Sequence, residues 1–109
     1  MDGLAKRPLG NTGLQVTVFA LGGVTYNLHD DAHAAAVVHR AIDLGVNYID
    51  TGHGYSDSER KIGPVMAERR DEVYLATKSN ARDYSTMKAH IEESLRRLQT
   101  DRIDCMQIH

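Results

Sequence analysis

The sequence has few of the residues that mark several classes of protein. Among its 109 residues, Cys105 is the only cysteine, tryptophan is missing, and two residues are proline. A single cysteine excludes an internal disulfide and any metal site built on a Cys-x-x-Cys pair. His29 and His33 have the four-residue spacing that can hold zinc on a helix, but no third ligand stands near them, and we expect no metal site.

Long apolar runs and a strong excess of one charge are also missing. No stretch of about 18 apolar residues is present to cross a bilayer, and the first ten residues, MDGLAKRPLG, lack the apolar centre of a secretory leader. The formal net charge of −2 gives no electrostatic basis for binding nucleic acid or an anionic membrane. We therefore expect a cytoplasmic globular protein with one modest core, drawn from 41% hydrophobic residues.

The sequence does contain a regular alternation of strand and helix patterns. Near the start, the segment from Gly10 to Gly13 predicts a tight hairpin, because Asn and Gly tolerate the positive φ of such turns. The apolar run from Val16 to Leu21 predicts a strand that ends at Gly22 and Gly23. Further strands are predicted in three segments: VNYID (46–50), EVYLATK (72–78) and RIDCMQIH (102–109).

Three segments between these strands have apolar residues at helical spacing. The first follows Asp30 and Asp31, a suitable N-cap pair, and Gly45 stands at its end. Ser56 and Glu59 have the spacing of a capping box for the second helix, and Ser85 is in position to cap the third. The apolar faces of the first and third helices contain these residues: Ala34, Val37, Val38, Ala41, Ile42; Met87, Ile91, Leu95, Leu98.

The alternation predicts an α/β fold with a parallel sheet. The strand ends, Gly22, Asp50, Lys78 and His109, are 28, 28 and 31 residues apart. Eight such units would total roughly 230 residues, close to a (β/α)8 TIM-type barrel. We therefore interpret residues 1–109 as the N-terminal half of such a barrel: a hairpin, four parallel strands and three helices, truncated at the end of the fourth strand. An open doubly wound sheet is the alternative, but no G-x-G-x-x-G follows the first strand.

Ionisable residues stand where three of these strands end. Barrel enzymes build their sites at the carboxyl ends of the strands, so Asp50, Lys78 and His109 are predicted to meet there with Tyr55 from the adjoining loop. A free tyrosine has a pKa of about 10, and a nearby lysine ammonium lowers it. Asp50 is placed to keep that lysine charged, and His109 to hold a substrate oxygen beside the tyrosine hydroxyl. This set predicts proton delivery to a carbonyl oxygen.

Five segments closely resemble the aldo-keto reductase family: RPLGNTGLQV, ALGG, AIDLGVNYIDTGHGYSDSERKIG, VYLATK and ESLRRLQTDRIDCMQIH. The resemblance implies a (β/α)8 barrel closed at its bottom by the hairpin, and NADPH-dependent reduction of an aldehyde or ketone. It implies that Tyr55 is the proton donor, Lys78 its pKa-lowering partner, Asp50 the carboxylate that pairs with this lysine, and His109 the residue that orients the carbonyl.

The resemblance also bears on the cofactor and the substrate. Gly22, Gly23 and Val24 match the first loop that approaches the nicotinamide, with Asp50 beside it. Many members carry Gly-Thr-Trp there, so Tyr26 is the candidate to replace the missing aromatic wall. NADH stays open beside NADPH, because the groups that would contact the 2′-phosphate lie in later strands.

Other interpretations stay open at this point. A cofactor-sensing module would keep the fold without turnover, and a Schiff-base enzyme would use Lys78 as its nucleophile. The chain by itself could also be a half-barrel scaffold. Its two open sheet edges would then need the rest of a barrel or self-association, and we expect little or no reductase activity from it alone.

Overall fold

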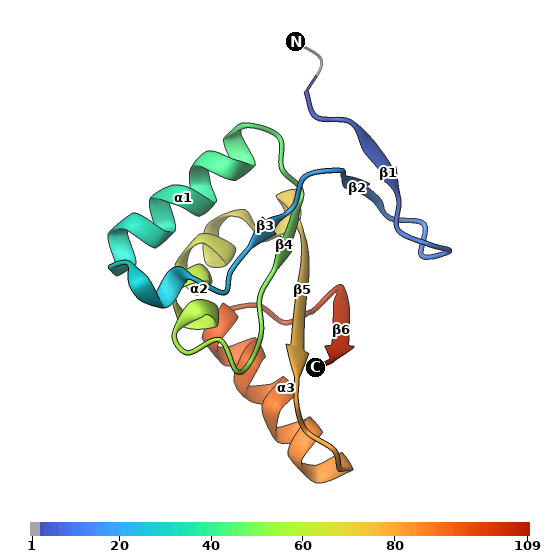
Figure 1. The fold of residues 1–109 in the computed structure, drawn as a ribbon, viewed down its shortest axis with the longest axis vertical. Coiled ribbons are helices and arrows are strands. Elements are labelled where there is room, and N and C mark those ends of the chain that lie inside the picture. The colour runs from blue at the N-terminus through green and yellow to red at the C-terminus, as the bar shows by residue number, and fades with distance from the viewer. Residues whose placement is uncertain (1–2) are drawn as a thin grey trace.

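The computed structural model describes residues 3–109, which form six strands, three α-helices and two 3-10 turns (Figure 1). The strands are β1 (Lys6–Pro8), β2 (Gln15–Thr17), β3 (Leu21–Gly22), β4 (Tyr48–Asp50), β5 (Tyr74–Ser79) and β6 (Cys105–Ile108). The helices are α1 (Asp31–Asp43), α2 (Ser58–Arg69) and α3 (Tyr84–Leu98), and the turns are η1 (Tyr26–Leu28) and η2 (Arg70–Glu72). None of the helices in this range combines the length and apolar character that a bilayer crossing requires.

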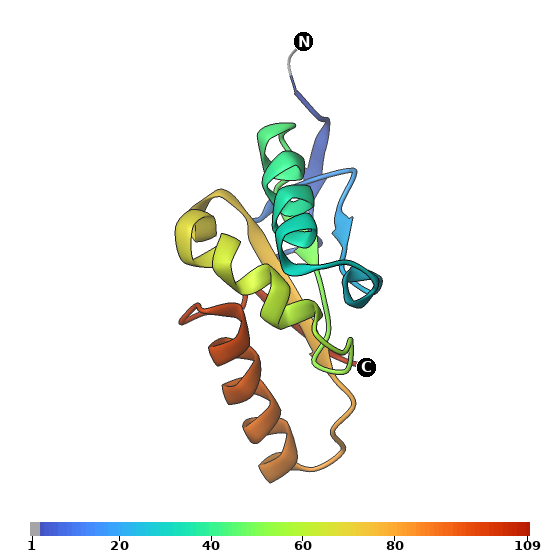
Figure 2. The ribbon, with the colours of Figure 1, turned by 90° about the vertical axis from the view of Figure 1, so that its left-hand side faces the viewer.

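Four strands form a parallel sheet in the order β3-β4-β5-β6. Strand order therefore follows chain order, without the reversal that an open doubly wound sheet would show. The three helices form one layer on a single face of this sheet (Figure 2). Sequential parallel strands with helices on one side are the arrangement of a (β/α)8 barrel wall.

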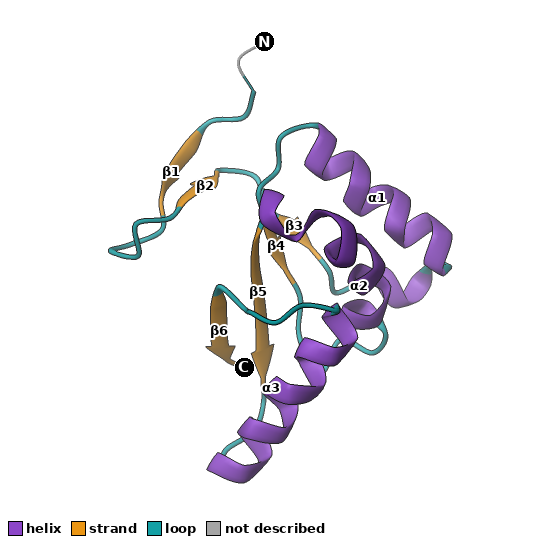
Figure 3. Cartoon of the chain, turned by 180° about the vertical axis from the view of Figure 1, so that it is seen from behind, coloured by secondary structure: helices purple, strands orange, loops and turns teal. Residues whose placement is uncertain are grey.

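The predicted hairpin is present as β1 and β2, which pair antiparallel with Arg7 opposite Val16. It stands beyond the amino ends of β4 and β5 (Figure 3). Asn47, just before β4, holds it there, because its side chain accepts from the Thr17 amide at 2.7 Å and donates to the Gln15 carbonyl at 2.9 Å.

The single strand predicted from Val16 to Leu21 is wrong, since the chain forms two short strands there. β2 ends at Thr17, whose hydroxyl donates to the Phe19 carbonyl at 2.5 Å, and β3 begins only at Leu21. This local bond turns the chain between the two sheets, and Phe19 is left 67% exposed.

The first helix has both of its predicted ends. Asp30 is the N-cap of α1, where its side chain accepts from the His33 amide at 2.7 Å. Leu44 is the C-cap, and Gly45 follows with a φ of 99°, a left-handed conformation that favours glycine.

The predicted caps of the other two helices are wrong. Asp83, and not Ser85, caps α3, because its carboxylate accepts from the Thr86 amide at 2.8 Å. Ser56 makes no capping box with Glu59: α2 begins at Ser58, and the Glu59 carboxylate accepts from the Thr77 hydroxyl at 2.7 Å. Ser85 instead donates its hydroxyl to Asp83 Oδ1 at 2.9 Å, and Glu59 binds Thr77 on β5 rather than the backbone of Ser56.

The core lies between the helix layer and the outer face of the sheet. Its fully buried members include Ile49 from β4, Leu75 from β5, Val38 from α1, Ile62 from α2 and Leu98 from α3. The apolar face predicted for α3 is only partly buried: Leu98 is enclosed, whereas Met87, Ile91 and Leu95 are half-buried. The reason is visible in Figure 1, where the N-terminal part of α3 extends past the end of β5.

Candidate functional site

Lys78 and Asp50 form an ion pair at the carboxyl edge of the parallel sheet. Asp50 is the last residue of β4, and Lys78 lies near the end of the neighbouring strand β5. The Lys78 Nζ is 3.1 and 3.0 Å from the two carboxylate oxygens of Asp50, and it also donates to the Thr51 carbonyl at 2.5 Å. Lys78 is 8% exposed, so the pairing holds an ammonium group that is nearly out of water.

Tyr55 lies above this pair on the loop between β4 and α2. The Lys78 Nζ is 4.6 Å from the centre of the Tyr55 ring, within the range of a cation–π interaction. The ring rests on the backbone of Gly52: a Cβ added at Gly52 would be 3.2 Å from two ring atoms and 3.3 Å from Lys78 Cγ. A side chain at position 52 would therefore push Tyr55 away from Lys78.

His109, the residue after β6, completes the group. Its ring meets the Tyr55 ring edge to face, with 5.7 Å between centroids and an angle of 87°. Its amide donates to the Ser79 carbonyl at 2.8 Å, and Arg82 Nη2 donates to the His109 carbonyl at 2.6 Å. The structure thus brings together all four residues that the strand ends predicted: Asp50, Tyr55, Lys78 and His109.

The glycines at the end of β3 lie beside this group. Gly22 pairs with Asp50 in the sheet, and the Gly23 amide donates to the Asp50 carbonyl at 2.8 Å. Gly23 is buried against α2, because a Cβ there would be 2.7 Å from Ser58 Oγ. In contrast, the Cβ position of Gly22 is open for 4 Å, and the next exposed side chain, Val24, is 57% accessible. An open surface therefore borders the ion pair on the β3 side.

Tyr26 does not lie at this surface, which corrects the prediction that it faces the substrate. Its side chain is 4% exposed and belongs to the core cluster with α1 and α2. Burial raises the pKa of its hydroxyl to about 12. The residue follows the glycines in sequence, but the η1 turn directs it inward, toward the helices.

Residues that no local pattern indicated also shape the site. The Thr51 carbonyl accepts from Lys78, and the His53 amide donates to the Lys78 carbonyl at 2.8 Å. Backbone groups leave no trace in a residue pattern. Only the family-specific spacing of the whole segment, from Asp50 to Gly63, carries a signal for them.

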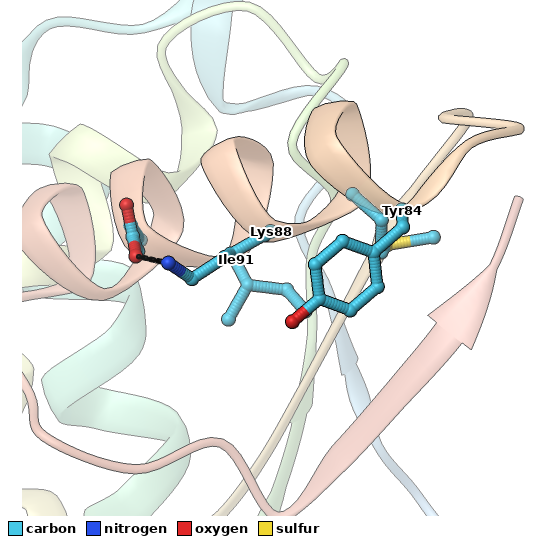
Figure 4. A pocket seen from close by; sticks show the side chains of 5 residues that line it. Tyr84, Lys88 and Ile91 are labelled. Atoms are coloured by element: carbon cyan, nitrogen blue, oxygen red, sulfur yellow. Dashed lines mark ion pairs between the residues drawn. The ribbon is translucent and has the colours of Figure 1, made fainter.

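A pocket of about 420 Å³ lies elsewhere, along the N-terminal half of α3. It is lined by Tyr84, Met87, Lys88, Ile91 and Glu92 (Figure 4). Lys88 and Glu92 form an exposed ion pair at 3.5 Å, one turn apart on the helix. None of the four residues at the sheet edge lines this pocket, so its apolar floor does not belong to the candidate site.

Comparisons with known proteins bear on the whole arrangement. A sequence profile of the aldo/keto reductase family matches residues 19–109. The chain belongs to the aldo/keto reductase family. Among curated relatives, 6-dehydroglucose reductase of Novosphingobium aromaticivorans is 35% identical, over 96% of this chain and 41% of its own length. L-galactose dehydrogenase of Arabidopsis thaliana is 32% identical, over 100% of this chain and 39% of its own length.

Solved structures of aldo-keto reductases share the fold. The enzyme of Bacillus halodurans, in its holo form, has a TM-score of 0.88 and 32% identity, covering 97% of this chain and 40% of that one. The enzyme of Klebsiella pneumoniae, in complex with NADP and acetate, has a TM-score of 0.81 and 32% identity, covering 87% and 36%. The predicted fold class is confirmed as part of an aldo-keto reductase TIM barrel. The chain spans about two fifths of the length of the curated relatives it matches.

Proposed function

We propose that this chain is the N-terminal half of an aldo-keto reductase barrel, residues 1–109, which reduces an aldehyde or ketone with NADPH when the barrel is complete. One observation carries the proposal: the Lys78 ammonium is 3.0 Å from an Asp50 oxygen and 4.6 Å from the centre of the Tyr55 ring. A positive charge held against the face of this ring is in position to stabilise negative charge that develops on Tyr55 when it gives up its proton.

The residues at the sheet edge suit a nicotinamide cofactor. Tyr55, Lys78, Asp50 and His109 are groups that move or hold protons, and none of them stores a hydride. The open surface at Gly22 and Val24 leaves room for a flat ring beside them. NADPH, when bound, would supply the hydride to the carbonyl carbon. The NADP complex of the Klebsiella pneumoniae enzyme supports this choice of cofactor.

Residues of this chain would carry out the proton transfer and orient the substrate. Tyr55 would give its hydroxyl proton to the carbonyl oxygen as that oxygen gains charge. Lys78, paired with Asp50, would stabilise the negative charge left on Tyr55. His109, with its ring edge toward Tyr55 at 5.7 Å between centroids, would orient the carbonyl beside the tyrosine hydroxyl.

The geometry of Lys78 weighs against the Schiff-base alternative. A Schiff-base lysine attacks as a neutral amine, whereas the Lys78 Nζ is engaged by both Asp50 oxygens and by the Thr51 carbonyl. A nitrogen engaged by three acceptors is not free to attack a carbonyl carbon.

The open sheet edges support a role for the rest of the barrel. In the described sheet, β3 and β6 each pair on one side only. Such edges attract further strands, and Ile108 on β6 is 79% exposed. Pairing of β6 with a following strand would cover that side chain and complete the wall around His109.

The decisive experiment compares Tyr55→Phe with Tyr84→Phe in the complete protein. NADPH oxidation with benzaldehyde is followed by ultraviolet absorbance, and the alcohol is identified by chromatography. We expect Tyr55→Phe to lower kcat/KM by about 10²- to 10⁴-fold, the usual contribution of a positioned proton donor. Tyr84 is 83% exposed on α3, so its variant should keep parental activity. Full activity in Tyr55→Phe would refute the assignment, and cofactor binding without turnover in the parent would favour the sensing module.

A further inference from the structure

The loop that carries Tyr55 is held from two sides through the backbone of a single residue, His53. The His53 amide donates to the Lys78 carbonyl at 2.8 Å, and Arg97 Nη1 donates to the His53 carbonyl at 3.1 Å. The Tyr55 amide in turn donates to the Gly52 carbonyl at 3.1 Å. The position of Tyr55 over Lys78 therefore depends on Arg97, which lies on α3, 44 positions beyond His53 in sequence.

Arg97 is fixed by a buried carboxylate. Its Nη1 lies 3.2 Å from Glu59 Oε1, and its Nη2 pairs with Glu93. Glu59 is 0% exposed, and its other oxygen accepts from the Thr77 hydroxyl at 2.7 Å. A carboxylate that is removed from water needs such partners, because removing one of them leaves the desolvation cost of the charge uncompensated. The guanidinium is thus locked between α2 and the loop.

The His53 side chain adds a second attachment to α3. Its ring stacks on that of His90, with 3.7 Å between centroids, and its Nε2 is 3.2 Å from Glu93 Oε1. His90 Nδ1 lies 2.7 Å from the hydroxyl of Ser79, the residue after Lys78. These contacts fix the position of the His53 ring, and they leave the His53 carbonyl available to accept from Arg97.

We propose that Arg97, held by Glu59, is a positioning residue that fixes the Tyr55 loop against Lys78. Within residues 3–109 no hydrogen bond or ion pair joins Arg97 to Tyr55 or Lys78, so Arg97 acts through the His53 carbonyl. Its catalytic consequence rests on the proposed function: a loop released from α3 would let Tyr55 shift, and a misplacement of about 1 Å can cost about 10²-fold in rate.

The matched control lies next to Arg97 on the same helix. Arg96 is exposed, and its side chain makes no hydrogen bond or ion pair within residues 3–109. Arg97→Met is therefore compared with Arg96→Met. Arg97→Lys serves as a second variant, because it keeps a cation beside Glu59 on a shorter side chain and should fold if Arg97→Met does not.

The first readout is amide hydrogen exchange in the complete protein, measured by NMR. In Arg97→Met and in Arg97→Lys, exchange of the His53 amide should be at least about tenfold faster than in the parent, while the Leu75 amide in β5 keeps its rate. Arg96→Met should change neither. Equal acceleration at both amides would show a general loss of stability and overturn the proposal, as would an unchanged His53 amide.

The second readout separates this proposal from the proposed function. Arg97→Met should lower kcat by about tenfold to 10²-fold with KM within about twofold of the parent, whereas Arg96→Met should keep both. Unchanged kcat in Arg97→Met, where Tyr55→Phe is inactive, would overturn the positioning role. Should Tyr55→Phe stay active, the proposed function fails, and the exchange rates alone decide whether Arg97 holds the loop.

Discussion

Gly63 is the position where one added methyl group should have the largest effect on stability. It lies on α2 and faces the last turn of α3: a Cβ there would clash with the carbonyl oxygen of Arg97 and would be 3.1 Å from Gln99 Nε2. The first obstacle is backbone, which cannot rotate aside as a side chain can. We therefore expect Gly63→Ala to move the two helices apart by about 1 Å.

The size of the effect on stability follows from the packing contacts that this separation of the helices would weaken. Inserting a methyl group into a packed interior typically costs about 1–3 kcal/mol. A gap of about 0.5–1 Å also removes a quarter to a half of the dispersion attraction across it, and Ile62, Met66 and Leu98 are fully buried at this junction. We therefore expect the free energy of unfolding to fall by about 3 kcal/mol, at the upper end of the range.

Urea unfolding, followed by circular dichroism, measures this loss. Gly54→Ala is the matched control, because nothing lies within 4 Å of its Cβ position and its φ is outside the left-handed region. Its free energy of unfolding should stay within about 0.5 kcal/mol of the parent. If Gly63→Ala lowers the free energy of unfolding no more than Gly54→Ala does, and the dependence of that free energy on urea is the same in both, the close contact between α2 and α3 is refuted.

Two further substitutions test buried polar groups. Tyr26→Phe removes a buried hydroxyl that has no hydrogen-bond partner within residues 3–109, so the free energy of unfolding at neutral pH should stay equal or rise by up to about 1 kcal/mol. Because the pKa of Tyr26 is raised to about 12, the unfolded chain loses its proton first. The stabilisation from Tyr26 should therefore be fully present below pH 10, and the free energy of unfolding should fall as the pH rises toward 12. In Tyr26→Phe this fall, measured by urea unfolding at each pH, should be smaller. The part that remains comes from Tyr48, because burial also raises the pKa of Tyr48 to about 12. Equal slopes of the free energy of unfolding against pH in the parent and in Tyr26→Phe would contradict this expectation. Asp104→Asn should lower the free energy of unfolding by about 1–3 kcal/mol, because the carboxylate accepts from Arg70 Nη2 at 2.6 Å and from the Leu75 amide at 2.8 Å; an unchanged urea midpoint would count against it.

Local signals predicted the elements whose ends depend on neighbouring residues alone. Asp30 and Gly45 bound α1 as expected, and the turn from Gly10 to Gly13 joins β1 and β2. Ser85 failed as a cap because the Asp83 carboxylate accepts from the Thr86 amide instead, and the capping box of Ser56 failed because Glu59 accepts from the Thr77 hydroxyl. A cap pattern identifies candidates, but tertiary contacts choose among them.

The candidate site was predictable where it depends on topology, and unpredictable where it depends on packing. Parallel strands of similar spacing bring their last residues to one edge, so Asp50 and Lys78 had to meet. Whether a side chain after a strand faces outward or inward depends on the helix that covers it, and Tyr26 turned inward for that reason. Glu59 and Arg97 are 38 residues apart, and no periodic pattern connects them.

The sequential order of the sheet has a consequence for how the site is assembled. Gly22 pairs with Asp50, Asp50 with Ala76, and Ala76 with Cys105, so each pairing closes a loop of fewer than 30 residues. Each strand can therefore pair with the strand before it as soon as it has been synthesised. The ion pair between Asp50 and Lys78 is therefore complete once β5 has joined β4, before His109 leaves the ribosome. The charged pair of the site therefore forms first, and His109, the latest of the four residues along the chain, joins it afterwards.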